Sequence, residues 1–229
     1  SKDNNTNYND GMIIKYNVIE KPEVNIKQGK VIGGSKDDQI TCITETQDGG
    51  YIVGGYFSSS SIDLGNGIVL HNNYTYDYTD GMIIKYGENG EAKWGKVVGG
   101  SRSDYINCII ETKEGGYLVG GYFKSSSIDL GNGEVLNNKG NDDGMIIKYG
   151  VDGNVEWGKA VGGSNSDYIN CIIETRDGGY LVGGYFYSSR IDLGNGVILE
   201  LDNNINSDGI LIKYSESGEV EWGKAVGGN

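Results

Sequence analysis

The sequence predicts an all-β protein built from tandem four-stranded blades of about 65 residues each. One observation is a recurring Asp-Gly-(Met/Ile)-(Ile/Leu)-Ile-Lys-Tyr segment, found at residues 10–16, 80–86, 143–149 and 208–214. A second is a recurring block that contains Gly-Gly-Tyr-(Ile/Leu)-Val-Gly-Gly-Tyr-Phe, found at residues 41–57, 107–123 and 170–186. Composition is the third: 40 glycines, one proline and 37% apolar residues indicate short apolar strands between glycine-rich turns.

Each full unit is predicted to hold two β-hairpins. In the second unit, residues 106–112 pair with 117–123 across a glycine-rich loop, and residues 145–149 pair with 155–161 across an Asp-Gly turn. These strands are apolar on both faces, so each sheet needs a neighbour on either side. Sheets repeated around an axis form a β-propeller, which the repeat length favours; a β-solenoid-like linear array is the alternative.

We expect a single repeat domain, made of a half-blade at residues 10–34 and repeats at 35–100, 101–163 and 164–228. Trp94, Trp157 and Trp222 occupy one strand position of successive units and are expected to be buried between neighbouring sheets. The unpaired half-blade predicts either self-association of the chain or continuation into further repeats of the same kind.

The cysteines also share one position of the repeat. They are Cys42, Cys108 and Cys171, each beside isoleucines in a predicted strand. Equivalent positions in successive blades do not come close enough for a disulfide. We therefore expect three free, buried thiols that act as small apolar side chains.

Charge excludes some classes of partner. The chain has 19 basic and 32 acidic residues, which gives a formal net charge of −13. Such a surface repels phosphate backbones and anionic lipids, so we expect no nucleic-acid binding. No apolar run approaches the roughly 20 residues that a membrane-spanning helix needs, so we expect no membrane insertion.

The order of the motifs resembles a known repeat family. The chain reads VGGS, then SDYINCIIET, GGYLVGGYF, SSSIDLGNG, DGMIIKYG and finally EWGKAVGG. Over essentially residues 10–228, this order is similar to the bacterial β-propeller repeats called SBBP repeats. The resemblance implies a propeller fold in a bacterial protein that is extracellular or located at the cell surface. It implies no shared enzymatic activity.

The leading functional prediction is a non-enzymatic, extracellular structural or interaction module, which self-assembles or forms part of a longer surface protein. Its expected partners are itself, further repeats of the same kind, a surface protein or a glycan. One alternative is a lectin-like module with one weak sugar site per repeat. Another is an enzyme whose site is built from loops, but no catalytic residue stands out, because nearly every candidate acid, base or nucleophile occurs in matching copies. His71 is the only histidine.

Candidate binding residues lie in the polar segments that precede each Asp-Gly motif. These segments differ between units, and variable loops on a repeated scaffold are where binding specificity resides. The first is rich in aromatic residues suited to sugar stacking or protein contact. The candidates are Tyr74, Tyr76, Tyr78, Asn138 and Asn203.

A recurring Ile-Asp-Leu-Gly-Asn-Gly sequence offers a possible calcium site, because Asp and Asn oxygens are hard-cation ligands. The alternative is a tight turn in which Asn-Gly supplies positive φ angles. No cofactor other than Ca²⁺ is suggested. The candidate ligands are Asp63, Asn66, Asp129, Asn132, Asp192 and Asn195.

Two further sets of carboxylates recur near the first strand of each unit. We expect them to be turn formers and solvated positions, with a cation-binding ring in a central channel as the alternative. They are Asp38, Asp104 and Asp167, and Glu45, Glu111 and Glu174.

Overall fold

The computed structural model describes residues 11–19, 23–73, 78–201 and 206–227, and in these ranges regular secondary structure consists of strands. The predicted all-β, repeated four-strand architecture is confirmed. A hairpin of β1 (Gly11–Ile19) and β2 (Glu23–Ile32) precedes three four-stranded antiparallel sheets, which we call blades 1, 2 and 3. No helix in the described ranges is long and apolar enough to cross a membrane.

The blades share one strand order. Blade 1 contains β3 (Asp38–Glu45), β4 (Tyr51–Phe57), β7 (Asp80–Tyr86) and β8 (Ala92–Val98). Blade 2 contains β9 (Asp104–Glu111), β10 (Tyr117–Phe123), β13 (Asp143–Tyr149) and β14 (Val155–Val161). Blade 3 contains β15 (Asp167–Glu174), β16 (Tyr180–Phe186), β19 (Asp208–Tyr214) and β20 (Val220–Val226). Both predicted hairpins of each unit are present, joined through their second and third strands.

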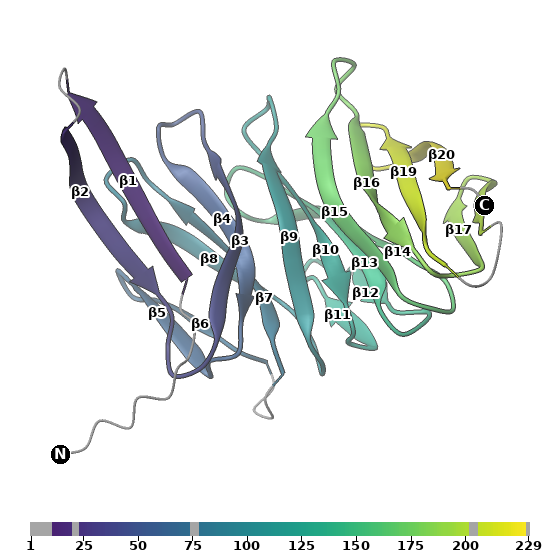
Figure 1. Ribbon diagram of the computed structural model, residues 1–229, viewed down its shortest axis with the longest axis horizontal. Helices are drawn as coiled ribbons and strands as arrows, with labels where there is room; N and C mark the ends of the chain where they lie inside the picture. The colour runs from purple at the N-terminus through teal and green to yellow at the C-terminus, as the bar shows by residue number, and fades with distance from the viewer. Residues whose placement is uncertain (1–10, 20–22, 74–77, 202–205, 228–229) are drawn as a thin grey trace.

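The sheets pack face to face in an open row (Figure 1). The β1–β2 hairpin lies at one end of the row and blade 3 at the other. The described residues therefore form propeller-like blades without a closed ring. Each core lies between sheets: Ile52 and Ile83 of blade 1 cluster with Ile106 and Ile109 of blade 2. This explains why β7 and β13 are buried at every residue, as expected for strands covered on both faces.

Side chains also tie the edge strands of neighbouring blades together. The hydroxyl of Thr44 on β3 donates a hydrogen bond of 2.8 Å to the carbonyl of Ile109 on β9. At the next junction, Asn107 Nδ2 donates over 2.9 Å to the carbonyl of Ile169 on β15. These polar side chains therefore link the first strands of neighbouring blades.

A small hairpin is inserted between the second and third strands of each blade, and the sequence did not predict its strands. The predicted tight turn is present, but two short strands flank it. Alternate side chains of these strands are buried, and among them Leu64 and Leu70 pack against Gly95 of β8. A Cβ added at Gly95 would lie 2.9 and 2.8 Å from methyl groups of these two leucines. The hairpins are β5 (Ser61–Gly65) with β6 (Ile68–His71), β11 (Ser127–Asp129) with β12 (Val135–Asn137), and β17 (Arg190–Gly194) with β18 (Val197–Glu200).

The tryptophans follow the expectation only in part. Trp157 is 9% exposed and rests on Gly218 of blade 3, where a Cβ would approach the indole to 2.8 Å. Trp94 is half-buried and rests in the same way on Gly153 of blade 2. The predicted burial of Trp222 is wrong: this side chain is 43% exposed, because no further sheet packs on that face of blade 3 within the described residues.

The three cysteines are free, as predicted, but they are not equally buried. Cys42 and Cys108 are half-buried between blades, where desolvation raises the pKa of Cys42 to about 11 and that of Cys108 to about 12. Cys171 is exposed, so its predicted burial is wrong for the same reason as that of Trp222.

We therefore expect the thiols to react at different rates. In native protein at pH 8, Cys171 should react with a thiol reagent at least about tenfold faster than Cys42 and Cys108, since the thiolate is the reactive form. Mass spectrometry of the alkylated protein would identify the first residue modified. Equal rates at all three cysteines, or a first modification at Cys108, would contradict the burial described above. Denatured protein, in which all three thiols should react alike, serves as the control.

Candidate functional site

The aspartates that precede the first strand of each blade are buried and have a structural role, so the expectation that they are solvated is wrong. They are Asp38, Asp104 and Asp167. Asp104 is fully buried at the start of β9. Its Oδ2 accepts hydrogen bonds from the Gly100 amide at 2.9 Å and the Ser125 hydroxyl at 2.6 Å. Its Oδ1 accepts from the amides of Lys124 and Ser125. Asp38 and Asp167 make the same contacts with the hydroxyls of Ser59 and Ser188. Through these hydrogen bonds, each carboxylate holds the segment that enters its blade against the loop that follows the second strand of that blade.

Two members of the second set of carboxylates, Glu111 and Glu174, join blades at their opposite edge, whereas Glu45 is exposed, as expected of a solvated position. Glu111 accepts a hydrogen bond of 2.8 Å from the amide of Gln47 in blade 1, and Glu174 accepts one of 2.8 Å from the amide of Lys113 in blade 2. Glu174 also lies 3.7 Å from the Lys113 ammonium. These glutamates are therefore engaged in contacts between blades, and no group of three or more potential metal-ligating side chains occurs within the described ranges.

Another buried carboxylate recurs at the start of the third strand. Asp80 and Asp143 are fully buried, and in each the Oδ1 atom has no hydrogen-bond partner. Their other oxygens accept from the amides of Asn73 and Lys139. Desolvation raises the pKa of each carboxyl from 3.8 to about 6, and the neighbouring charges of Asp104 and Asp167 act in the same direction.

This shift predicts how stability depends on pH. A carboxyl with a raised pKa binds its proton more tightly in the folded state, so the stabilisation present below about pH 4 is lost as the pH rises through 6. We expect the free energy of unfolding to fall by about 2 kcal/mol per carboxyl between pH 4.5 and 7.5. Asp48, whose pKa the Thr46 hydroxyl and Lys85 lower to about 2, titrates below this range.

Urea denaturation at both pH values measures this effect. Asp143→Asn should be more stable than the wild type at pH 7.5 and should show a shallower pH dependence. A wild-type stability that rises between pH 4.5 and 7.5, or an unchanged slope in Asp143→Asn, would show that these carboxyls are not the responsible groups.

The predicted loop candidates do not form one site within the described ranges. Tyr74, Tyr76 and Asn203 lie outside the described residues. Tyr78 is 39% exposed. The Asn138 amide closes its own loop: Nδ2 donates to the Phe123 carbonyl at 2.9 Å, and Oδ1 accepts from the Gly140 amide at 2.8 Å. Asn138 thus has a structural role in this loop.

The candidate calcium ligands lie on the tips of the inserted hairpins. Asn66 and Asn195 have φ angles of 55° and 52°, so the predicted positive-φ turn is present at both. Asp63 accepts a hydrogen bond of 2.8 Å from the Gly65 amide; Asp129 and Asp192 accept equivalent bonds from the Gly131 and Gly194 amides. These contacts stabilise the turn, and calcium binding here stays a prediction.

A line of tyrosines crosses all three blades, and the repeat pattern of the sequence did not predict it. Within blades 2 and 3, cross-strand pairs stack with ring centroids 4.8 Å apart: Tyr105 with Tyr122, and Tyr168 with Tyr185. Between blades, rings meet edge to face: Tyr56 with Tyr105 at 4.9 Å and Tyr122 with Tyr168 at 4.7 Å. All five rings are half-buried. We call these residues the tyrosine strip.

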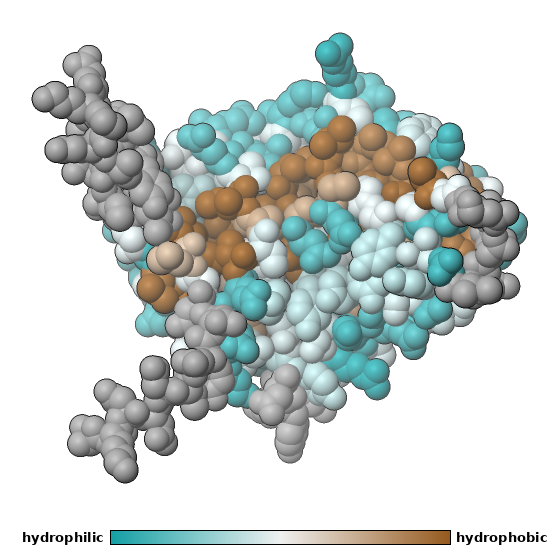
Figure 2. All heavy atoms as spheres, viewed as in Figure 1, coloured by the Kyte–Doolittle hydropathy of each residue, from teal (hydrophilic) through white to brown (hydrophobic). Residues whose placement is uncertain are grey.

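Charge and apolar surface accompany the tyrosine strip. Tyr168 donates a hydrogen bond of 2.7 Å to Asp142, and the charge of Asp37 acts on Tyr56. Burial and Asp142 raise the pKa of Tyr168 to about 12, so its hydroxyl stays protonated at neutral pH. Figure 2 shows a band of apolar residues running across the same view, over the row formed by β3, β9 and β15. Exposed Ile43 and Ile173 belong to these strands.

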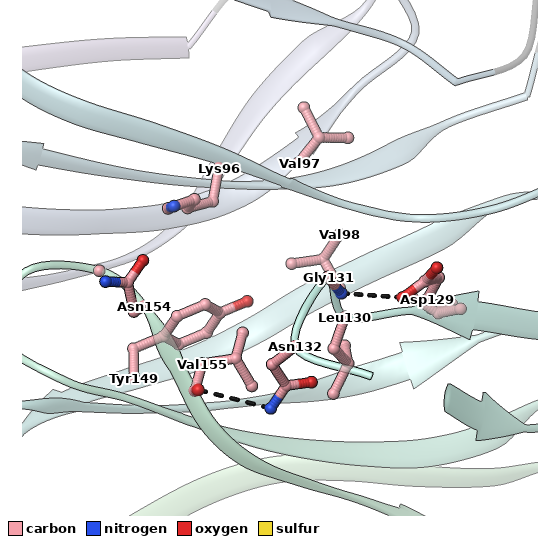
Figure 3. Close-up of a pocket in the computed structure, with 12 residues that line it drawn as sticks. Lys96, Val97, Val98, Asp129, Leu130, Gly131, Asn132, Tyr149, Asn154 and Val155 are labelled. Carbon is pink, nitrogen blue, oxygen red and sulfur yellow. Dashed lines mark hydrogen bonds between the residues drawn. The ribbon is translucent and has the colours of Figure 1, made fainter. Parts of the chain in front are cut away.

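A pocket of about 390 Å³ lies between blades 1 and 2, and we call it the junction pocket. One wall is β8, with Lys96; the other is the tip of the β11–β12 hairpin, with Asp129 and Asn132. Tyr149 and Asn154 of blade 2 line the remainder (Figure 3). A smaller pocket of about 160 Å³ occupies the equivalent place between blades 2 and 3, lined by Lys159, Asn195 and Glu219.

Comparison with known proteins supports the repeat architecture. No model of a known protein family matches the chain. In an alignment 146 positions long that covers 58% of the chain, it is 27% identical to an uncharacterised WD repeat-containing protein of Acanthamoeba polyphaga mimivirus. The chain spans about a tenth of that relative's length, since the match covers 10% of it. WD repeats are blades of β-propellers, which agrees with the propeller-like blades described above. The closer resemblance to SBBP repeats stays a prediction.

Proposed function

We propose that this chain is a non-enzymatic interaction module that uses the tyrosine strip to bind a protein partner. The observation that carries the proposal is the continuity of the strip, whose half-buried rings cross every blade at centroid distances of 4.7–4.9 Å. Tyrosine is enriched at protein interfaces because its ring gives apolar contact and its hydroxyl gives a hydrogen bond.

Charge indicates the kind of partner. The chain carries a formal net charge of −13, and Asp37 and Asp142 act on the rings of the strip. A basic segment of a protein, with arginines that stack on tyrosine faces and are attracted by this negative charge, has the complementary chemistry. In this proposal, the module is displayed outside a bacterial cell or at its surface, and further repeats of the same kind extend the strip.

Selection from a random peptide library against the immobilised chain tests the proposal. We expect the selected peptides to be rich in arginine and to lose at least about tenfold in affinity for Tyr122→Ala and Tyr168→Ala, about 1.4 kcal/mol or more. Val151→Ser is the matched control, because Val151 is 68% exposed in the turn at the other end of the blade 2 strands. Peptides that bind the tyrosine variants as tightly as the wild type, or a library without binders, would refute the strip as the binding face.

A further inference from the structure

The three junctions between sheets contain one equivalent lysine each, and their surroundings differ. At the first junction, Lys30 Nζ donates a hydrogen bond of 2.9 Å to the Leu64 carbonyl and lies 5.1 Å from the Tyr86 ring centroid. At the third, Lys159 lies 3.7 Å from Glu219. At the second junction, the Lys96 ammonium makes no ion pair or hydrogen bond with any residue that the structure describes. The ammonium group in the junction pocket therefore has no ion-pair partner among the described residues, although the Asp129 carboxylate lines the same pocket.

A difference between blades 2 and 3 accounts for the missing counter-ion of Lys96. Blade 3 has Glu219 where blade 2 has Asn154, whereas the equivalent Glu91 of blade 1 accepts a hydrogen bond from the Asn89 side chain and does not pair with Lys30. In blade 3, the Glu219 carboxylate lies between Lys159 Nζ and Asn195 Nδ2, at 3.7 and 3.3 Å. The corresponding lysine and asparagine in the junction pocket are Lys96 and Asn132, with no carboxylate between them. The cavity is accordingly larger, about 390 Å³ compared with 160 Å³.

The rest of the junction pocket is suited to hydroxyl groups. Tyr149 is only 3% exposed, and its hydroxyl has no partner in the described part of the chain. Figure 3 shows this hydroxyl pointing into the pocket, between Lys96 on one side and Asp129 on the other. Asp129 uses one oxygen for the Gly131 amide at 2.9 Å, so its second oxygen can accept a hydrogen bond from a ligand.

We propose that the junction pocket binds a small hydroxylated carboxylate of the size of a sugar acid. Its carboxylate takes the place that Glu219 fills in blade 3, between Lys96 Nζ and Asn132 Nδ2. Its hydroxyls contact the Tyr149 hydroxyl and the free oxygen of Asp129. The negative charge of Asp129 orients the ligand, because it repels the carboxylate and accepts hydrogen bonds from the hydroxyls. A volume of about 390 Å³ falls in the range of small-molecule sites.

Titration with sodium glucuronate tests this site, with glucose and acetate as the comparisons. Nuclear magnetic resonance shifts of the Trp94 indole provide the readout, since that ring rests on Gly153 at the edge of the pocket. We expect glucuronate to bind at a stoichiometry of one and at least about tenfold more tightly than either comparison. Equal affinity for glucose would overturn the role of the carboxylate. Equal affinity for acetate would overturn the role of the hydroxyls, and no saturable binding of glucuronate would overturn the site.

Two substitutions exchange the residues that blades 2 and 3 carry at this repeat position. Because one is expected to weaken binding and the other to add a site, a folding defect cannot account for both results. Asn154→Glu should give Lys96 its own counter-ion and weaken glucuronate binding by at least about tenfold. Glu219→Asn should open the equivalent pocket between blades 2 and 3 and raise the stoichiometry to two. Tyr149→Phe removes only a hydroxyl and should weaken binding by about fivefold. Unchanged binding in both Asn154→Glu and Tyr149→Phe would place the ligand elsewhere and overturn the proposal. The site lies apart from the tyrosine strip, so its outcome does not depend on that of the peptide selection.

Discussion

Replacing Gly121 by alanine should prevent blade 2 from forming its normal sheet. A Cβ at this position would lie 1.9 Å from the backbone carbonyl oxygen of Tyr105 on the neighbouring strand β9. The pairing of β9 and β10 shifts register at Gly120 and Gly121, where the two backbones approach closely. A backbone oxygen cannot rotate away as a side chain can. We expect a loss of at least about 3 kcal/mol in the free energy of unfolding.

Chemical denaturation followed by circular dichroism would measure this loss. Gly29→Ala is the matched control, because a Cβ there has no atom within 4 Å, and its cost should stay within about 0.5 kcal/mol. The same close approach occurs at Gly55 and Gly184, so alanine at either position should reproduce the effect. A cost below about 1 kcal/mol for Gly121→Ala would mean that the strands are not held this closely.

The second large effect is expected at Trp157. Truncation to alanine removes an indole that fills the space between blades 2 and 3 and rests on Gly218. Loss of a core aromatic side chain costs about 3–5 kcal/mol, because the transfer free energy is lost and a cavity remains.

Trp222→Ala provides an internal comparison for this prediction. Trp222 occupies the equivalent position but is 43% exposed, so its truncation should cost less than about 1 kcal/mol. Both values can be obtained from denaturant titrations monitored by far-ultraviolet circular dichroism, which does not depend on tryptophan emission. Similar costs at the two positions would contradict the difference in burial.

The hairpins of each blade could be predicted from sequence because their turns are local. Gly115 and Gly153 have φ angles of 85° and 76°, which glycine adopts readily, and both lie in turns that the glycine pattern indicated. The β11 and β12 strands of the inserted hairpin escaped prediction because they have only three residues each. Such short segments show no clear alternation of apolar and polar residues.

The tyrosine strip and the junction pocket depend on contacts between blades, which a linear pattern does not reveal. Tyr56 meets Tyr105 only after two sheets have stacked. The importance of Asn154 follows from its position in the same pocket as Lys96, which is a contact between two blades. An alignment of the three blades marks this position, because Asn154 stands where the other two blades have glutamate. Departures from a repeat are therefore the signal to search for first in a chain of this kind.

The side-chain bonds from Thr44 and Asn107 to the next edge strand have a mechanical consequence. They join each sheet only to its immediate neighbour, so an applied load passes from one blade to the next in series. A chain pulled along the row should yield in discrete steps, with one sheet detaching at each step while the others stay folded. Its resistance would then be set by the weakest junction and would not grow with the number of sheets.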